Sequence, residues 1–248
     1  MLDLFTLQSL LLAVAGLVIG IFSVAVGGGM FVSIPLVEWI FPQASLGAIV
    51  GNIKVSSFFR GVGSTLSTWK QIAFLQVLKT MPALLLGTAV GSTTISRLDQ
   101  KWLLPAILIA IIFTIQAPKF ASKITNKGFA LFSFAIGFYT GVLGAGIGVM
   151  LVALMRLKYP ADSEIAFVKI QARFAELLTT IIAVIVHLIS GNLVSALWIP
   201  LSVGCLVGGY VGGFLLEKMG NLSGSTQKKI LYAAFAVDII VAGTKFFE

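Results

Sequence analysis

Long apolar runs, separated by short polar connections, dominate the pattern of this 248-residue sequence. Asp, Glu, Lys and Arg are absent from residues 4–37, 128–155 and 177–216. Apolar runs of about 18 residues or more are long enough to cross the hydrocarbon core of a bilayer as helices. The pattern therefore predicts an all-α, polytopic membrane protein.

The apolar runs divide into segments whose connections carry turn and helix-breaking residues. The expected segments are 5–25, 29–41, 45–68, 75–96, 102–117, 129–143, 148–157, 164–189, 194–216 and 229–246. Two of them, 29–41 and 148–157, reach only about 15–20 Å at ~1.5 Å per residue, against a hydrocarbon core of about 30 Å. The chain has eight membrane helices if each short segment continues the one before it, and ten if each turns back.

Basic residues in the connections distinguish these arrangements, because cytoplasmic loops carry an excess of Lys and Arg. Eight spans put six basic residues on one side and seven on the other, which gives no orientation. If both short segments turn back, ten lie on one side, and only Arg97, Lys101 and Lys245 lie on the other. The charge pattern favours this second arrangement, with both termini outside; eight spans in two parallel halves is the alternative.

The two halves of the chain resemble each other. Glycines recur at one offset, and the matched pairs are Gly20 with Gly137, Gly27 with Gly144, and Gly29 with Gly146. Residues 53–59 also resemble residues 168–174. We expect a first repeat over 1–118, a basic connecting loop over 119–128 and a second repeat over 129–248, within a single membrane domain. Five segments per repeat is an odd number, so the repeats would be inverted; chance similarity between glycine-rich runs is the alternative.

Each half contains a glycine cluster inside an apolar run. The clusters are Gly27, Gly28 and Gly29 in the first half, and Gly144 and Gly146 in the second. Glycine weakens a helix, and broken helices at membrane depth occur where the backbone is buried or lines a cavity. A helix that restarts after such a break presents free N–H groups and its positive dipole end, which bind anions. Ser23 and Thr140, at equivalent positions, would add hydroxyl donors. Paired breaks therefore indicate a transporter's substrate site; close helix packing is the alternative.

Four basic residues fall inside expected spans: Lys54, Arg60, Lys169 and Arg173. A charge at the bilayer centre costs at least ~2.5–3.5 kcal/mol, so such residues usually face a cavity or a partner. We predict that they line the substrate pathway. Snorkelling of the lysines to the interface and a structural ion pair between Arg173 and Glu176 are the alternatives.

Three acidic residues, Glu38, Glu176 and Asp238, are candidates for proton coupling, because intramembrane carboxylates serve as proton relays. His187 lies next to an expected turn, and we expect an ordinary interfacial histidine there. The sequence carries no metal-binding or phosphate-binding motif, so we expect no catalytic residue, metal or cofactor. A net charge of +8 reflects the basic connections and does not indicate a nucleic-acid partner.

The triple glycine followed by residues 31–36, the duplication and the stretch from Pro82 to Gly91 resemble the sulfite exporter TauE/SafE family. The resemblance covers nearly the whole chain. It implies a permease for small sulfur-containing anions such as sulfite or an organosulfonate, with export as its direction. The family's glycine break falls on Gly27–Gly29, and its repeat on Gly144 and Gly146; the second copy departs from the triple glycine at Ala145.

We therefore expect a secondary transporter, multi-pass in the cytoplasmic (inner) cell membrane, that works by alternating access. Its expected partners are a small anionic substrate and the lipid bilayer, with a homodimer as an open possibility. An anion channel with the same basic lining and an intramembrane enzyme are the alternatives.

Overall fold

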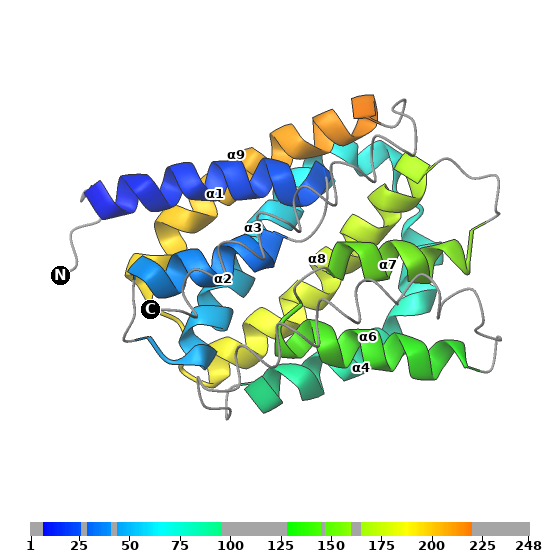
Figure 1. Cartoon of the computed structure of the whole chain (residues 1–248). Helices are drawn as coiled ribbons and strands as arrows, with labels where there is room; N and C mark the ends of the chain where they lie inside the picture. The colour runs from blue at the N-terminus through cyan, green and yellow to red at the C-terminus, as the bar shows by residue number, and fades with distance from the viewer. Residues whose placement is uncertain are drawn as a thin grey trace, which may run out of the picture.

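The computed structural model describes residues 7–25, 29–40, 44–95, 128–144, 147–159 and 165–219. Within these ranges all regular structure is helical (Figure 1). The elements are α1 (Leu7–Ala25), α2 (Gly29–Ile40), α3 (Leu46–Thr68), the 3-10 turn η1 (Trp69–Gln71), α4 (Phe74–Ile95), α6 (Phe129–Val142), α7 (Ile147–Arg156), α8 (Ile165–Ile189) and α9 (Ser195–Met219). The all-α prediction is confirmed. The expected segments 102–117 and 229–246 lie outside the described residues.

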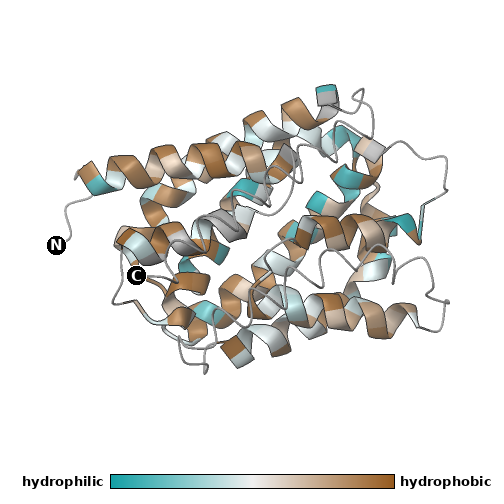
Figure 2. Cartoon of the chain, in the orientation of Figure 1, coloured by the Kyte–Doolittle hydropathy of each residue, from teal (hydrophilic) through white to brown (hydrophobic). Residues whose placement is uncertain are grey.

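Four of the described helices, α1, α4, α8 and α9, are long and apolar enough to cross a membrane, while α6 and α7 are shorter apolar helices. The helices are predominantly hydrophobic along their lengths (Figure 2). Large apolar side chains such as Leu10 and Val14 of α1 and Val203 and Phe214 of α9 are exposed. Apolar surface on the outside and polar side chains inside is the arrangement that a lipid solvent favours.

Glycines bring the outer helices into close backbone contact. A Cβ on Gly204 of α9 would overlap the carbonyl oxygen of Ala13 in α1, and one on Gly87 of α4 would overlap the carbonyl of Phe134 in α6. Small residues allow membrane helices to approach closely where van der Waals packing drives association. The alternative interpretation of glycine as a packing residue therefore holds at these positions, which lie away from the glycine breaks.

Helices α3 and α8 form the central pair, and they run antiparallel. Gly51, near the start of α3, packs against His187, near the end of α8. At the opposite end, Gln71, just after α3, accepts a hydrogen bond from Gln171, near the start of α8. Helix α9 also packs on α3, and helices α4 and α7 pack on α8. The middle of the α3–α8 pair is thus enclosed by other helices.

Both short helices turn back on the helix that precedes them. Helix α1 ends at Ala25 and α2 begins at Gly29; α6 ends at Val142 and α7 begins at Ile147. In Figure 1, α2 runs back from the end of α1, and α7 runs back from the end of α6. This is the local arrangement that the charge pattern favours. The orientation of the chain, the internal duplication and the bounds 1–118, 119–128 and 129–248 stay predictions.

Candidate anion-binding site

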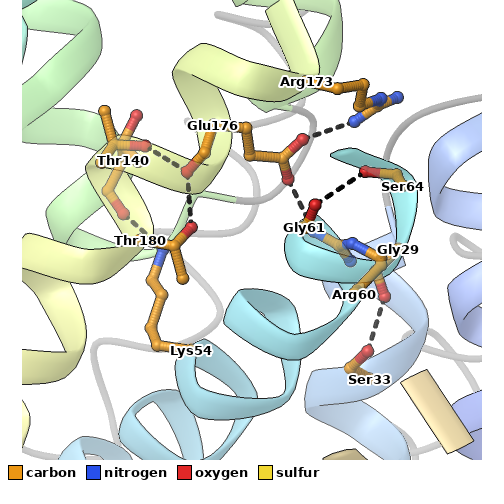
Figure 3. A network of polar contacts seen from close by, with 11 residues as sticks. Gly29, Ser33, Lys54, Arg60, Gly61, Ser64, Thr140, Arg173, Glu176 and Thr180 are labelled. Carbon is orange, nitrogen blue, oxygen red and sulfur yellow. Dashed lines mark hydrogen bonds and ion pairs between the residues drawn. The ribbon is translucent and has the colours of Figure 1, made fainter. Parts of the chain in front are cut away.

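One carboxylate joins two arginines from opposite halves of the chain. Glu176 of α8 contacts Arg60 of α3 through Oε1 and Nη2 at 2.6 Å, and Arg173 of α8 through Oε2 and Nη1 at 2.5 Å (Figure 3). All three side chains are less than a tenth exposed. The i,i+3 ion pair of Arg173 and Glu176, the structural alternative to a role in the pathway, is present. The Glu176 carboxylate also pairs with Arg60, which lies 116 positions earlier in the sequence, a contact that no local sequence pattern indicates.

Lys54 of α3 adds a third basic side chain to the two arginines. Its side chain is 2% exposed, and Nζ donates a hydrogen bond of 2.5 Å to the backbone carbonyl of Thr140 in α6. The Thr140 hydroxyl donates to the carbonyl of Ile136, so this residue contributes its backbone oxygen to the site. The charges of Glu176 and Arg60 both act on the Lys54 amine. Snorkelling to the interface is thereby excluded for Lys54, since its head group is buried.

The short helices that follow the two glycine breaks, one in each half of the chain, begin beside this charged cluster. A Cβ on Gly29, the first residue of α2, would lie 3.3 Å from Nη1 of Arg60. A Cβ on Gly148, in the first turn of α7, would lie 2.7 Å from Nη1 of Arg173. Each short helix thus begins against one guanidinium, and the absent side chains make room for it.

Gly144 also belongs to this arrangement. A Cβ at Gly144 would overlap Nζ of Lys54, and the residue has a φ of 70°, a conformation that glycine adopts without strain. Its N–H donates to the carbonyl of Tyr139, which closes the end of α6. The turn between α6 and α7 therefore depends on glycine twice, for its backbone conformation and for the space beside the ammonium group.

Two serines flank the start of α2. Ser33 is buried and its hydroxyl donates to the carbonyl of Gly29 at 2.8 Å. Ser23 is 1% exposed, and within the described part of the chain its hydroxyl makes no hydrogen bond. A Cβ on Gly29 would overlap that hydroxyl, so Ser23 lies directly beside the first residue of α2. A buried, unpaired hydroxyl is costly, and a ligand oxygen at this point would satisfy it.

Lys169 differs from Lys54, although their sequence positions match. Lys169 is partly exposed on α8, one turn before Arg173, whose charge acts on it. The two lysines therefore do not lie in equivalent surroundings. Of the remaining predicted positions, Gly27, Gly28, Gly146 and Asp238 lie outside the described residues, as does the side chain of Glu38.

Several polar residues escaped the sequence-based prediction. The hydroxyls of Thr179 and Thr180 donate to the backbone carbonyl of Glu176 and satisfy it within α8. His187, expected at the interface, is fully buried, with Nδ1 3.3 Å from Nδ2 of Asn192. Helix α3 covers the ring at Gly51, a contact between distant segments, and the depth of His187 in the membrane stays a prediction. Uncharged residues inside apolar helices carry no signal that separates a site from ordinary packing.

The charges of the cluster suit an anion. Two buried guanidiniums, on Arg60 and Arg173, share a single carboxylate, with the Lys54 amine beside them, so within this described cluster positive charge exceeds negative. Burying charge without a partner is expensive, and an arriving anion would lower that cost. A guanidinium has five N–H donors in a planar fork, which matches the oxygens of a small oxyanion.

The fold and this site define a multi-pass helical membrane protein with an anion-compatible cationic cluster in its interior. The comparison with family models then places the chain: it belongs to the family described as sulfite exporter TauE/SafE, whose model matches residues 12–246. The family predicted from the glycine pattern is confirmed, and membership makes the chain a membrane permease of an exporter family. No curated protein and no solved structure was matched.

Proposed function

We propose that this protein is a secondary transporter that carries a small sulfur-containing oxyanion, such as sulfite or an organosulfonate, out across the cytoplasmic membrane by alternating access. The observation that carries the proposal is the meeting of Lys54, Arg60 and Arg173 around one carboxylate where both glycine breaks end. The family supplies the chemical class of the substrate. The surrounding membrane and the anion are its proposed partners.

In this proposal the anion binds beside Glu176 and takes the guanidinium donors that the carboxylate leaves unused. One hydrogen bond from each arginine goes to Glu176. The first turns of α2 and α7 add backbone N–H groups and the positive ends of two helix dipoles. The Ser23 hydroxyl adds a donor on the side of α2. Rocking of one half against the other then exposes this site to each side of the membrane in turn.

Glu176 is also the proposed coupling residue. An ionised carboxylate holds both arginines, whereas a protonated one would release them to the substrate. Anion binding and proton uptake at Glu176 would then favour each other. Among the three acidic candidates, Glu176 is the one whose side chain contacts the cationic cluster in the described structure; Glu38 and Asp238 stay predictions.

Counterflow in proteoliposomes tests the proposal, with labelled sulfite, thiosulfate, sulfoacetate and taurine as probes. We expect saturable uptake that is driven by unlabelled anion on the opposite side. Lys54→Gln removes a buried charge-assisted donor, worth about 1.5–3 kcal/mol, and should weaken affinity roughly 10- to 100-fold. Lys169→Gln is made in parallel.

Lys79→Gln, on an exposed part of α4, is the matched control and should leave affinity unchanged. Unsaturable flux that does not depend on the opposite anion would indicate a channel. Unchanged affinity in both Lys54→Gln and Lys169→Gln would remove these lysines from the site.

A further inference from the structure

Two buried carboxamides fasten loops of one half of the chain to the central helix of the other. The first belongs to Asn52 of α3, which is 0% exposed. Its Oδ1 accepts the N–H of Val194 at 2.8 Å, and its Nδ2 donates to the carbonyl of Asn192 at 3.3 Å and to that of Ala48 at 2.6 Å. Asn192 and Val194 lie in the connection between α8 and α9. We name these contacts the Asn52 clasp.

The second carboxamide belongs to Gln171 of α8, also 0% exposed. Its Oε1 accepts the N–H of Ala73 at 2.8 Å, and its Nε2 donates to the carbonyl of Gln71 at 2.8 Å and to that of Phe167 at 3.3 Å. Gln71 and Ala73 lie in the connection between α3 and α4. We name these contacts the Gln171 clasp.

The two clasps have the same construction. Each uses a carboxamide on one central helix, bonds the carbonyl four residues earlier on that helix, and holds a carbonyl and the N–H two residues later in the opposite loop. Each joins residues before position 118 to residues after position 129. If these contacts only held loops against a rigid bundle, the same hydrogen-bond pattern would not be needed at both ends.

The clasps lie at opposite ends of the α3–α8 pair. At ~1.5 Å per residue, the helix between Gln171 and Ile189, where α8 ends, is about 27 Å long. That length is close to the hydrocarbon thickness of about 30 Å. Glu176 and Arg60 lie between the two clasps along their helices, so one clasp lies on each side of the charged cluster along the α3–α8 axis.

We propose that the Asn52 clasp and the Gln171 clasp are the two gates of the transport pathway, and that one opens in each access state. The inference rests on the proposed alternating-access function. If one half of the chain moves against the other, contacts that join the halves at one end must break. Neutral hydrogen bonds suit this role, because water replaces them when they open and each contributes little net stability.

Side-specific thiol labelling tests this proposal. The chain has one cysteine, Cys205, which is buried, so Cys205→Ser gives a background without thiols. Thr180→Cys then places a reporter beside Glu176 and Lys54 (Figure 3). A charged, membrane-impermeant maleimide is applied to either side of proteoliposomes. Separate cysteines at the exposed positions Ser190 and Lys70 identify which side each loop faces.

We expect Asn52→Ala to raise the labelling rate of the reporter roughly five- to tenfold from the Ser190 side alone, since two cross-half bonds are lost. Gln171→Ala should produce the same increase from the Lys70 side alone. Gln76→Ala, an exposed carboxamide on α4, is the matched control and should change neither rate. If either alanine variant fails to fold, Asn52→Asp and Gln171→Glu replace it, since they keep size but repel the loop carbonyl.

Equal increases from both sides, increases from the same side, or no increase in either variant would overturn the assignment of the clasps as gates. The labelling needs no substrate, so the two proposals fail separately. The expected side-specific pattern without sulfite counterflow would support the gates and refute the substrate. Saturable sulfite counterflow without that pattern would leave the substrate standing and reduce the clasps to structural fastenings.

Discussion

Glu176→Gln isolates the charge that holds the cluster together. The amide keeps the size of the side chain but leaves Arg60 and Arg173, both less than a tenth exposed, without their carboxylate. Breaking a buried ion pair by removing one partner costs about 3–5 kcal/mol. Both pairs share one carboxylate, so we expect this cost once. For a chain of this size, about 2–4 °C of melting temperature corresponds to 1 kcal/mol, which gives a fall of roughly 6–20 °C.

Cys205 provides the assay. It is buried in α9, so a fluorogenic thiol reagent reports unfolding of the purified protein in detergent as the temperature rises. Adding Arg173→Gln to Glu176→Gln removes one of the two unpaired charges, and the double variant should recover at least ~1 kcal/mol relative to the single variant. Sulfite should raise the melting temperature of Glu176→Gln more than that of the parent, because a bound anion supplies the missing charge.

Two outcomes would refute this reasoning. A melting temperature of Glu176→Gln equal to that of the parent would mean that the carboxylate does not hold the arginines. Strict additivity of Glu176→Gln and Arg173→Gln would mean that the two groups act independently, in conflict with their ion pair of 2.5 Å.

Alanine substitutions of glycines distinguish effects on the binding site from effects on helix packing. Gly148→Ala places a methyl group 2.7 Å from Nη1 of Arg173, so we expect roughly tenfold weaker sulfite affinity with a nearly unchanged melting temperature; a loss of stability with full affinity would contradict this. Gly204→Ala drives a methyl group into the backbone of α1 at Ala13 and should cost about 1–3 kcal/mol in thermal unfolding. Gly191→Ala, which meets nothing within 4 Å but has a φ of 70°, is its control and should cost about 1 kcal/mol of backbone strain without loss of counterflow.

The helical segments were predictable because lipid imposes a simple rule on sequence. The segment expected over 45–68 is α3, which spans Leu46–Thr68. The segment expected over 164–189 is α8, which spans Ile165–Ile189. Apolar runs can satisfy their backbone in lipid only as helices, and glycine or turn residues end them. The same rule predicted the breaks before Gly29 and Ile147, since a cluster of helix-breaking residues inside an apolar run indicates that the helix is interrupted there.

The assembled site was only partly predictable. Lys54, Arg60 and Arg173 stood out because charge is rare inside spans, and the structure brings them together. Matching Lys169 to Lys54 overstated the likeness of their surroundings, because Lys169 is only partly buried. Asn52 and Gln171 carried no signal at all, since an amide inside an apolar helix looks the same whether it bonds its own helix or a distant loop.

The sequence by itself determined the membrane environment, the helices, the two breaks and the family, because each follows from the order of residues along the chain. Only the tertiary structure decided that Glu176 pairs with Arg60, that α2 and α7 begin beside the two paired arginines, and that two amides join the halves at opposite ends. Local patterns describe neighbours within a few turns of helix. Charge pairing and hydrogen bonding act between atoms a few ångströms apart in space, and antiparallel packing of α3 and α8 brings residues more than a hundred positions apart to that distance.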